Sequence, residues 1–521
     1  MRDKTFGVNP MRGLFGTLLL TILISGCATN PVTGKSELTF VSESEEISIG
    51  SRQYLPAQQS QGGTYDVDPE LTRYVTEVGK RLATVSDRAL PYEFVVINDS
   101  TPNAWALPGG KIPINRGLLM QLENEAELAA VLGHEIVHAA ARHGARAMER
   151  AMLLQGAVML TALGSKDSEY SNYIVGGASI GAQLISQRYG RQAELEADRY
   201  GMEYMAQAGY DPNAAVSLQE KFVALKDGQS PHWLEGLFAS HPPSAERVQK
   251  NTEKSQEIRA LQHKDWEVGQ ARYDHQLAYL ESKKEAYQSF DQANTLLADK
   301  EIAVALNRIE RAIRLESAEP RFLGLKADVL FQQKKYSNAI SQYSDALKHD
   351  DAYYEYYLGR GLSHSKLGNR SKAKTDLEKS NSLLPTALAT NELGNLALNE
   401  GDRASAKQYF GEVARTSGSL SEAARQSFVR LDLSDNPASY FRVQSQLREG
   451  QFFSAITNNS GLRVKSAVVQ FNARINGEIR QASRRTGPLA NGQTAGLYPG
   501  WALSETDLVD GINVRVLSVT L

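Results

Sequence analysis

His134-Glu135-Ile136-Val137-His138 is the stretch that decides the interpretation of this 521-residue chain. Residues four apart on a helix lie on one face, so His134 and His138 can direct imidazole nitrogens at the same ion. Glu135 lies beside them, where it can act on the proton of a metal-bound water. This is the H-E-x-x-H arrangement of zinc hydrolases.

The residues before the motif favour a helix. Asn124 and Glu127 have the spacing of a capping box, and strong helix formers lead from there into the motif. The alternative is a surface helix with two ordinary histidines, and it needs no partner elsewhere in the chain.

A zinc site needs a third protein ligand, and a downstream segment offers one. Ala141 and Gly144 stand where the metzincin extension requires Gly and His, so that class is excluded. Glu194 and Asp198 are again four apart and share a helical face. Glu194 can complete a His-His-Glu site with an open fourth position, and Asp198 can accept the second ring N–H of a ligand histidine. We therefore predict one Zn²⁺ per chain.

Three further motifs accompany HEIVH in a fixed order. They are NAWALPGGKI at 103–112, ELEAD at 194–198 and SHPPSAER at 240–247. Together they resemble the HtpX/BepA-type gluzincin metallopeptidases, relatives of the CAAX prenyl proteases, over about residues 40–260. The resemblance implies zinc held by His134, His138 and Glu194, with Glu135 as general base.

The resemblance also implies an edge strand against which a substrate peptide lies extended. This type of backbone pairing tolerates many sequences. Pro108-Gly109-Gly110 would then turn the chain into a hairpin. The substrate-binding residues predicted on this strand are Asn103, Ala104, Trp105, Ala106 and Leu107.

His241 has two interpretations. In the resembling family this histidine lies near the metal, where it either stabilises the oxyanion or occupies the open zinc position and holds the enzyme inactive. Arg247 would add positive charge there, and we include both as candidate catalytic residues. The alternative is that His241-Pro242 only caps the helix that begins near Ser244. His143 lies off the metal face, and we interpret it as structural.

The N-terminus has the pattern of a secretory signal. Arg2, Lys4 and Arg12 precede a short apolar run from Leu14 to Ile24, and small residues lead to Cys27. The ending resembles a bacterial lipobox, which implies cleavage before Cys27 and lipid on its sulfur. The alternative is an uncleaved anchor helix, and Met11 is a second possible start.

Lipidation would use the only cysteine, so disulfides within one chain are impossible. Ala28 after the cysteine favours, by analogy with enterobacterial sorting, the periplasmic face of the outer membrane of a Gram-negative bacterium. Residues 151–187 contain two apolar stretches too short to span a bilayer, which we predict to be helices over the cleft. The alternative is an interfacial segment on the membrane.

The second half of the chain has an internal repeat. Ala305, Ala339, Ala373 and Ala406 recur at intervals of 34, 34 and 33 residues, and a second series follows seven residues later. This is the tetratricopeptide period, and we predict about four repeats with a concave protein-binding face, against the alternative of a generic helical bundle.

After about residue 435 the pattern changes to period two, and Asn476-Gly477 is a strong hairpin signal. The fold class is therefore multidomain α+β: a mainly helical zincin domain with a small β-sheet, an α-solenoid of tetratricopeptide repeats, and a small antiparallel β-sandwich. The predicted divisions are a signal peptide (1–26), a lipidated N-terminus and linker (27–60), the metallopeptidase domain (61–255), a connecting helix (256–285), the repeats (286–434) and the C-terminal β domain (435–521).

These predictions indicate a lipid-anchored zinc endopeptidase that cleaves misfolded or stalled envelope proteins. The membrane would be contacted through the lipid on Cys27, and the repeats would reach outer-membrane assembly machinery. The net charge of −3 provides no basic surface for nucleic acid. The alternative function is a chaperone or assembly scaffold for outer-membrane proteins whose protease site is largely latent.

Overall fold

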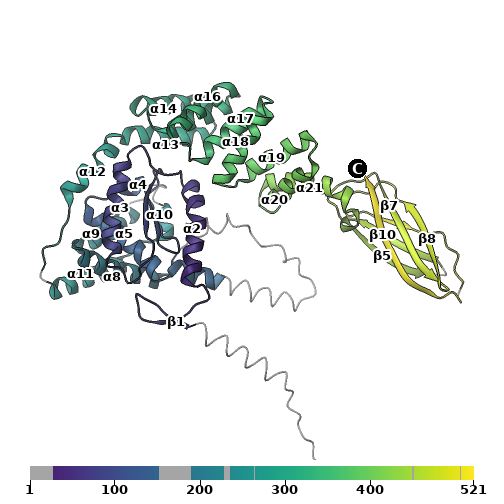
Figure 1. Ribbon diagram of the computed structural model, residues 1–521, viewed down its shortest axis with the longest axis horizontal. Coiled ribbons are helices and arrows are strands. Elements are labelled where there is room, and N and C mark those ends of the chain that lie inside the picture. The colour runs from purple at the N-terminus through teal and green to yellow at the C-terminus, as the bar shows by residue number, and fades with distance from the viewer. Residues whose placement is uncertain (1–26, 152–188, 228–234, 263, 449–450, 505) are drawn as a thin grey trace, which may run out of the picture. The chain divides into compact units, whose positions relative to one another are not determined.

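The computed structural model describes residues 27–151, 189–227, 235–262, 264–448, 451–504 and 506–521 (Figure 1). The chain forms two compact units, Met1–Ser363 and His364–Leu521, which we describe separately. The predicted signal peptide and the two predicted helices of 151–187 lie outside the described residues, apart from 151 itself. Among the described residues, no helix has both the length and the apolar character needed to cross a bilayer.

The centre of the first unit is helix α5, Glu125–Ala140, which is buried along its whole length. The helices packed on it are α3 (Pro69–Ala83), α8 (Arg191–Ala208) and α9 (Asn213–Asp227), and α11 (Ala245–Leu261) packs on α8 and α9. The Asn124 side chain caps α5 by accepting the Glu127 N–H at 2.9 Å. The second bond of the predicted capping box, from the Asn124 N–H to the Glu127 carboxylate, is replaced. The Glu127 carboxylate instead accepts the N–H of Glu123 at 2.8 Å.

A close crossing of α5 and α8 brings the two motif helices together. Gly133 on α5 faces Gly201 on α8, and a Cβ placed on Gly201 would lie 3.0 Å from the His134 nitrogen. Side chains at these two positions would hold the helices apart. The glycines therefore allow the backbone that carries His134 to approach the helix that carries Glu194 and Asp198.

A small sheet lies beside α5. Strand β3, Glu93–Ile97, pairs in parallel with β4, Lys111–Asn115, and the short helix α4, Arg116–Leu119, follows β4. The predicted edge strand at 103–107 runs antiparallel to β4, but it forms only isolated bridges, Ala104 with Ile114 and Leu107 with Lys111. Pro113 in β4 lacks an N–H, so the regular ladder cannot continue through the middle of this pairing. Gly109 and Gly110 make the predicted turn with φ of 81° and 88°.

The N-terminal described segment begins with a two-stranded pairing of β1, Cys27–Thr29, with β2, Ser36–Leu38. Helix α2, Glu43–Ser60, follows. Its buried Glu46 binds both Arg88 and Arg142, and this fixes α2 to the residues just after α5.

The stretch predicted as one connecting helix, 256–285, is instead broken. Helix α11 ends at Leu261 and α12, Gln270–Ser282, begins after Gly269, which has a φ of 69°. Between them the Trp266 indole donates to the Ala206 carbonyl at 3.2 Å, and the Glu267 N–H donates to the Gly209 carbonyl at 2.9 Å. These tertiary bonds replace helical ones and end the helix.

The predicted repeat is confirmed as a series of antiparallel helix pairs. In the first unit the helices are α13 (Lys284–Ala298), α14 (Ile302–Leu315), α15 (Pro320–Gln332), α16 (Tyr336–His349) and α17 (Tyr354–Lys366), the last of which runs into the second unit. The second unit continues with α18 (Arg370–Leu383), α19 (Ala387–Glu400), α20 (Arg403–Val413) and α21 (Ser419–Asp435). Ala305, Ala339, Ala373 and Ala406 are all fully buried, as close helix packing requires.

Hydrogen bonds join the first repeats to the region of β3 and α4. Asn98, just after β3, donates to Glu319 at 3.0 Å, and Arg321 donates to the Asn98 carbonyl at 2.6 Å. The guanidinium of Arg116 lies 3.6 Å from the centre of the Tyr287 ring. One apolar core is continuous across this junction, and it includes residues from α3 and α5 as well as Phe290 and Phe322.

The C-terminal region contains two three-stranded antiparallel sheets, which confirms the predicted β fold. Their strand orders are β5-β6-β9 and β10-β7-β8. The strands are β5 (Phe441–Arg448), β6 (Gln451–Asn458), β7 (Ser466–Ile475), β8 (Glu478–Arg485), β9 (Thr494–Leu497) and β10 (Val509–Thr520). Phe452 and Phe471, one from each sheet, pack in the same core with their ring centres 6.1 Å apart. Asn476 and Gly477 form the predicted hairpin turn with positive φ.

Candidate metal centre

Four buried side chains converge between α5, α8 and the loop that joins α10, Glu235–Ser240, to α11. They are His134, His138, Glu194 and His241, and their nearest nitrogen and oxygen atoms all lie within 4.8 Å of one another. The structure thus brings together the three residues predicted as metal ligands and adds His241 to the same cluster.

The spacing within the cluster fits a tetrahedral ion. Bonds of about 2.0–2.1 Å to zinc place neighbouring ligand atoms roughly 3.3 Å apart. The Nε2 atom of His134 lies 3.0 Å from Nε2 of His138 and 3.6 Å from Oε2 of Glu194. Nδ1 of His241 lies 3.3 Å from Nε2 of His134 and 3.2 Å from Oε1 of Glu194. Imidazole nitrogens and a carboxylate are also the ligand types that zinc prefers.

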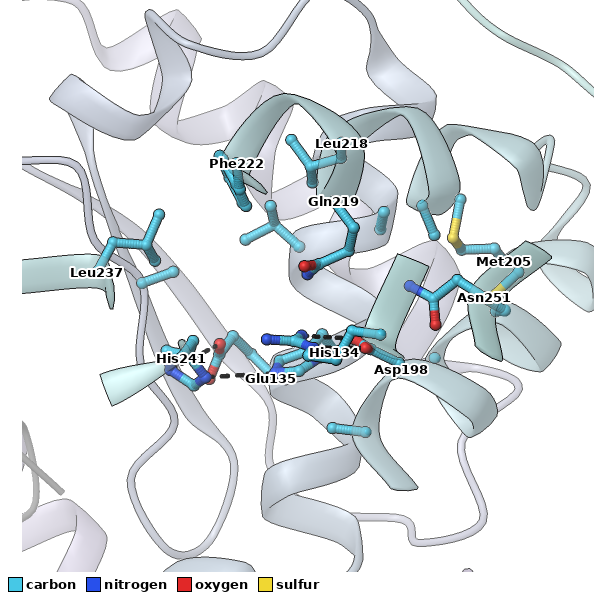
Figure 2. A pocket seen from close by; sticks show the side chains of 18 of the residues that line it. His134, Glu135, Asp198, Met205, Leu218, Gln219, Phe222, Leu237, His241 and Asn251 are labelled. Atoms are coloured by element: carbon cyan, nitrogen blue, oxygen red, sulfur yellow. Dashed lines mark hydrogen bonds and ion pairs between the residues drawn. The ribbon is translucent and has the colours of Figure 1, made fainter. Parts of the chain in front are cut away.

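The ring nitrogen of His134 that faces away from the cluster is hydrogen-bonded to Asp198. Its Nδ1 lies 2.9 Å from Asp198 Oδ1, as the four-residue spacing on α8 predicted (Figure 2). Burial disfavours charge on the ring, but the bonds to Asp198 and Glu194 outweigh it and raise the pKa of His134 to about 10. Without a metal this ring therefore carries a proton on both nitrogens. The bond to Asp198 holds the Nδ1 proton, whereas Nε2, which is directed at the cluster, would give up its proton to a bound cation.

Arg247 binds carboxylates of the site. Its Nε and Nη2 atoms donate to the two oxygens of Asp198 at 2.6 Å each, and Nη1 lies 2.9 Å from Glu194 Oε2. This is the bidentate geometry typical of strong arginine–carboxylate pairs. These bonds orient Asp198 and Glu194. The role predicted for Arg247 was different, because there its positive charge faces the oxyanion.

His138 contacts two residues, His143 and Tyr189, that the sequence did not connect with the metal site. Its Nδ1 lies 2.7 Å from Nδ1 of His143, and Nε2 of His143 lies 3.5 Å from Glu196. The Tyr189 ring stacks on the His138 ring, with centres 3.9 Å apart and planes at 17°. His143 is thus structural, as predicted, but it contacts a ligand of the cluster. The only sequence feature that could have indicated this contact is the position of His143, five residues after His138. No sequence feature indicated the contact of Tyr189.

Glu135 is buried beside the cluster. Its Oε1 is 3.6 Å from Nε2 of His241, and its Oε2 is buried without a hydrogen-bond partner among the described residues. Burial raises the pKa of the Glu135 carboxyl, so this group is a better proton acceptor than an exposed glutamate.

The electrostatics of the cluster favour cation binding. Burial opposes the ionisation of Glu194, but His241 and hydrogen bonds from His134 and His138 outweigh it and hold the pKa of Glu194 well below its usual value. Burial lowers the pKa of His138 far below that of an exposed histidine. An ionised carboxylate and a neutral imidazole are the forms that bind metal ions.

The predicted substrate segment borders this site. Trp105 and Leu107 donate their N–H groups to the carbonyls of Pro113 and Lys111 at 3.3 and 2.9 Å, so these odd-numbered positions face β4. Alternate residues along an extended chain point their backbone groups the opposite way. Ala104 lies in this segment and also lines a cavity that includes His134, Glu135 and His241.

Comparison with known proteins identifies the family. Residues 69–254 match peptidase family M48, and residues 354–385 match a tetratricopeptide repeat. The chain is 30% identical over 181 residues to the metalloprotease YcaL of Escherichia coli (strain K12), covering 33% of this chain and 68% of that protein. The chain belongs to peptidase family M48, with tetratricopeptide repeats behind the M48 region.

Two longer relatives are also similar. The mitochondrial metalloendopeptidase OMA1 of Schizosaccharomyces pombe is 39% identical over 182 residues, covering 34% of this chain and 51% of that protein. The beta-barrel assembly-enhancing protease of Escherichia coli (strain K12) is 29% identical over 266 residues, covering 48% and 53%. The chain spans about half the length of these two relatives.

Proposed function

We propose that this protein is a zinc-dependent endopeptidase, anchored by lipid at the periplasmic face of the outer membrane, that cleaves misfolded or stalled envelope proteins. The observation that carries the proposal is the cluster of ligand atoms with tetrahedral spacing, next to a buried glutamate whose carboxylate has a free oxygen. Its zinc ligands would be His134, His138 and Glu194.

Zinc, when bound, acts as a Lewis acid and lowers the pKa of water at its open position. Glu135 would take the proton from the attacking water and deliver it to the leaving amine, since its Oε2 is buried beside the cluster without a hydrogen-bond partner among the described residues. Asp198 and Arg247 would keep His134 and Glu194 oriented, so Arg247 is a positioning residue in this scheme.

The substrate would lie along residues 103–107. The backbone groups of Ala104 and Ala106 point away from β4 and can pair with an extended peptide, which accounts for binding independent of sequence. Because Ala104 and Glu135 line the same cavity, a peptide paired at Ala104 would lie near Glu135.

Location and partners rest on further features. Cys27 follows an apolar run of signal-peptide type, and its lipidation would tether the chain. A relative named for β-barrel assembly and a repeat array of a protein-binding type support envelope proteins as substrates and outer-membrane assembly machinery as a partner. A Cys27→Ser variant should leave the membrane fraction or accumulate as a precursor in cell fractionation; a processed, membrane-bound variant would contradict the anchor.

The second candidate function is an assembly scaffold with a largely latent site. Nδ1 of His241 favours it, because this atom lies where a fourth ligand would stand and would close the site.

Metal content and cleavage of unfolded casein test the proposal. The wild type should contain one zinc per chain and cleave casein, whereas Glu135→Gln should keep zinc and lose cleavage by several orders of magnitude. Glu127→Gln, a buried change on the same helix outside the cluster, is the matched control. Cleavage by Glu135→Gln at the wild-type rate would contradict the mechanism. The scaffold function would be favoured if the wild type contained one zinc per chain but did not cleave casein, and if the His241→Ala variant did cleave it.

A further inference from the structure

The cavity beside the ligand cluster has an apolar wall. Its large apolar lining residues are Val131, Met202, Met205, Leu218, Phe222 and Leu237. Figure 2 shows Leu218, Phe222 and Leu237 on one side of the cavity and Met205 on the other. A wall of this kind stabilises an apolar substrate side chain by removing it from water.

Two amides interrupt the apolar lining. Gln219 on α9 is 7% exposed and Asn251 on α11 is 2% exposed, and Figure 2 shows both side chains reaching into the cavity. Oε1 of Gln219 and Nδ2 of Asn251 have no hydrogen-bond partner within the part of the chain that the structure describes. Leaving a buried polar group unpaired costs about 1–3 kcal/mol, so these atoms favour a ligand that completes their bonds.

Each amide carries one donor end and one acceptor end, and rotation about its terminal bond exchanges them. Each amide can therefore present either a donor or an acceptor to a ligand in the cavity. A hydroxyl fits this pair, because it donates one hydrogen bond and accepts another. A primary amide fits for the same reason.

The charged lining residues do not favour a charged ligand. Asp198 and Arg247 bind each other at 2.6 Å and so neutralise one another, and the carboxylate of Glu135 in the same lining is assigned to the attacking water in the proposed mechanism. A charged tip placed among the apolar side chains would lose its hydration, which is unfavourable when these charged groups are already engaged.

We propose that this cavity selects the residue next to the scissile bond, and that it prefers a long side chain, apolar along its length and neutral but hydrogen-bonding at its tip. Tyrosine and glutamine have this chemistry. Gln219 and Asn251 are the specificity-determining residues. The inference rests on the proposed peptidase function, since Ala104 connects the cavity to the predicted substrate segment.

Two matched pairs of peptides test the preference. Internally quenched peptides of alanine and serine, each with one varied residue, carry tyrosine or phenylalanine and glutamine or methionine, and mass spectrometry locates the cleaved bond. The wild type should cleave next to tyrosine with about tenfold or higher kcat/KM than next to phenylalanine, because phenylalanine leaves the amides unpaired. Glutamine should exceed methionine in the same way.

Variants assign the preference to the two amides. Gln219→Leu and, separately, Asn251→Leu should remove or invert the tyrosine preference while cleavage next to phenylalanine continues. Gln53→Leu is the matched control, since Gln53 is also a buried glutamine with an unpaired Oε1 but lies on α2 outside the cavity. A preference kept in both cavity variants would overturn the assignment.

Binding separates this inference from the proposed function. The affinities of the same peptides for Glu135→Gln, measured by fluorescence anisotropy, should follow the same order. If the wild type hydrolysed none of the peptides but the protein still bound the tyrosine peptides selectively, the proposed peptidase function would be contradicted and the cavity preference would be retained. Equal binding and equal cleavage of tyrosine and phenylalanine peptides would overturn the preference.

Discussion

The Arg247 guanidinium donates two hydrogen bonds of 2.6 Å to the two oxygens of Asp198, and both side chains are buried. Asp198 in turn holds His134 at 2.9 Å, so a residue on α11 orients a predicted ligand on α5 through a carboxylate on α8. Contacts of this kind fix the ring and its proton, and their loss typically weakens metal binding 10–100-fold.

Arg247→Lys should therefore lower zinc affinity by roughly 10–100-fold, because a lysine cannot reproduce the bidentate bond. Competition with a fluorescent chelator measures this affinity. Arg259→Lys on the same helix, where the arginine forms a partly exposed pair with Asp211, is the control. Unchanged affinity with a large loss of kcat would instead support the oxyanion role predicted from the sequence.

Glu194→Ala should abolish stoichiometric zinc, as expected when one of three protein ligands is removed. Glu196→Ala is the informative comparison, since Glu196 lies two residues away and pairs with Lys35 at 3.0 Å and His143 at 3.5 Å. Elemental analysis of the zinc content of both variants decides whether Glu194 or Glu196 is the ligand. Zinc retained in the first and lost in the second would reassign the ligand.

Gly201→Ala should destabilise the protein and weaken zinc binding together. The added methyl would lie 3.0 Å from the His134 nitrogen, and forcing atoms into a packed interior costs about 1–3 kcal/mol. Thermal unfolding and zinc affinity measure the two effects. Gly190→Ala has open space for its methyl and should change neither. A normal Tm with normal zinc affinity would show that the helix crossing tolerates expansion.

His241→Ala should raise basal casein cleavage, because its Nδ1 lies at ligand spacing from His134 and Glu194 and would close the metal site. Initial rates at saturating zinc measure the change, with self-cleavage followed by mass spectrometry. A loss of kcat of roughly a hundredfold would support oxyanion stabilisation. Activity and zinc affinity that both stay at wild-type values would leave His241 as a helix-start residue only.

Asp328→Asn should stabilise the protein more at pH 8 than at pH 4. Burial and the nearby Glu355 raise the pKa of Asp328 to about 7, against an ordinary value near 4. The folded state then binds the proton more tightly than the unfolded state, and the stability due to this group is lost as the pH rises from about 4 through 7. The asparagine removes that loss and can still accept the bond that Tyr343 donates at 2.5 Å. Tm across this pH range measures it, with Asp345→Asn as control; a pH-independent difference would contradict the assignment.

The sequence predicted the features that depend on local spacing. Four-residue intervals placed His134 with His138 and Glu194 with Asp198 on helical faces, and the 34-residue phase predicted which alanines pack between repeat helices. Asn476-Gly477 predicted its hairpin because that turn requires positive φ at both positions. Each of these signals lies within one element or one repeated unit.

Contacts between distant elements were not predictable in the same way. The stacking of Tyr189 on His138 and the turning of Arg247 toward Asp198 depend on how helices cross. The break after Leu261 has the same origin, because Trp266 and Glu267 form bonds to the end of α8 that no local pattern encodes. A single sequence specifies such partners only through the folded structure.

The hydrogen bonds that Asn98 donates to Glu319 and accepts from Arg321 have a consequence for how this protein can be divided. The repeat period begins near residue 286, yet the apolar core continues past it and the compact unit extends to Ser363. The first repeats and the catalytic region should therefore melt in one cooperative step. The first repeats are therefore not a removable module, since deleting them would uncover apolar side chains of the M48 region.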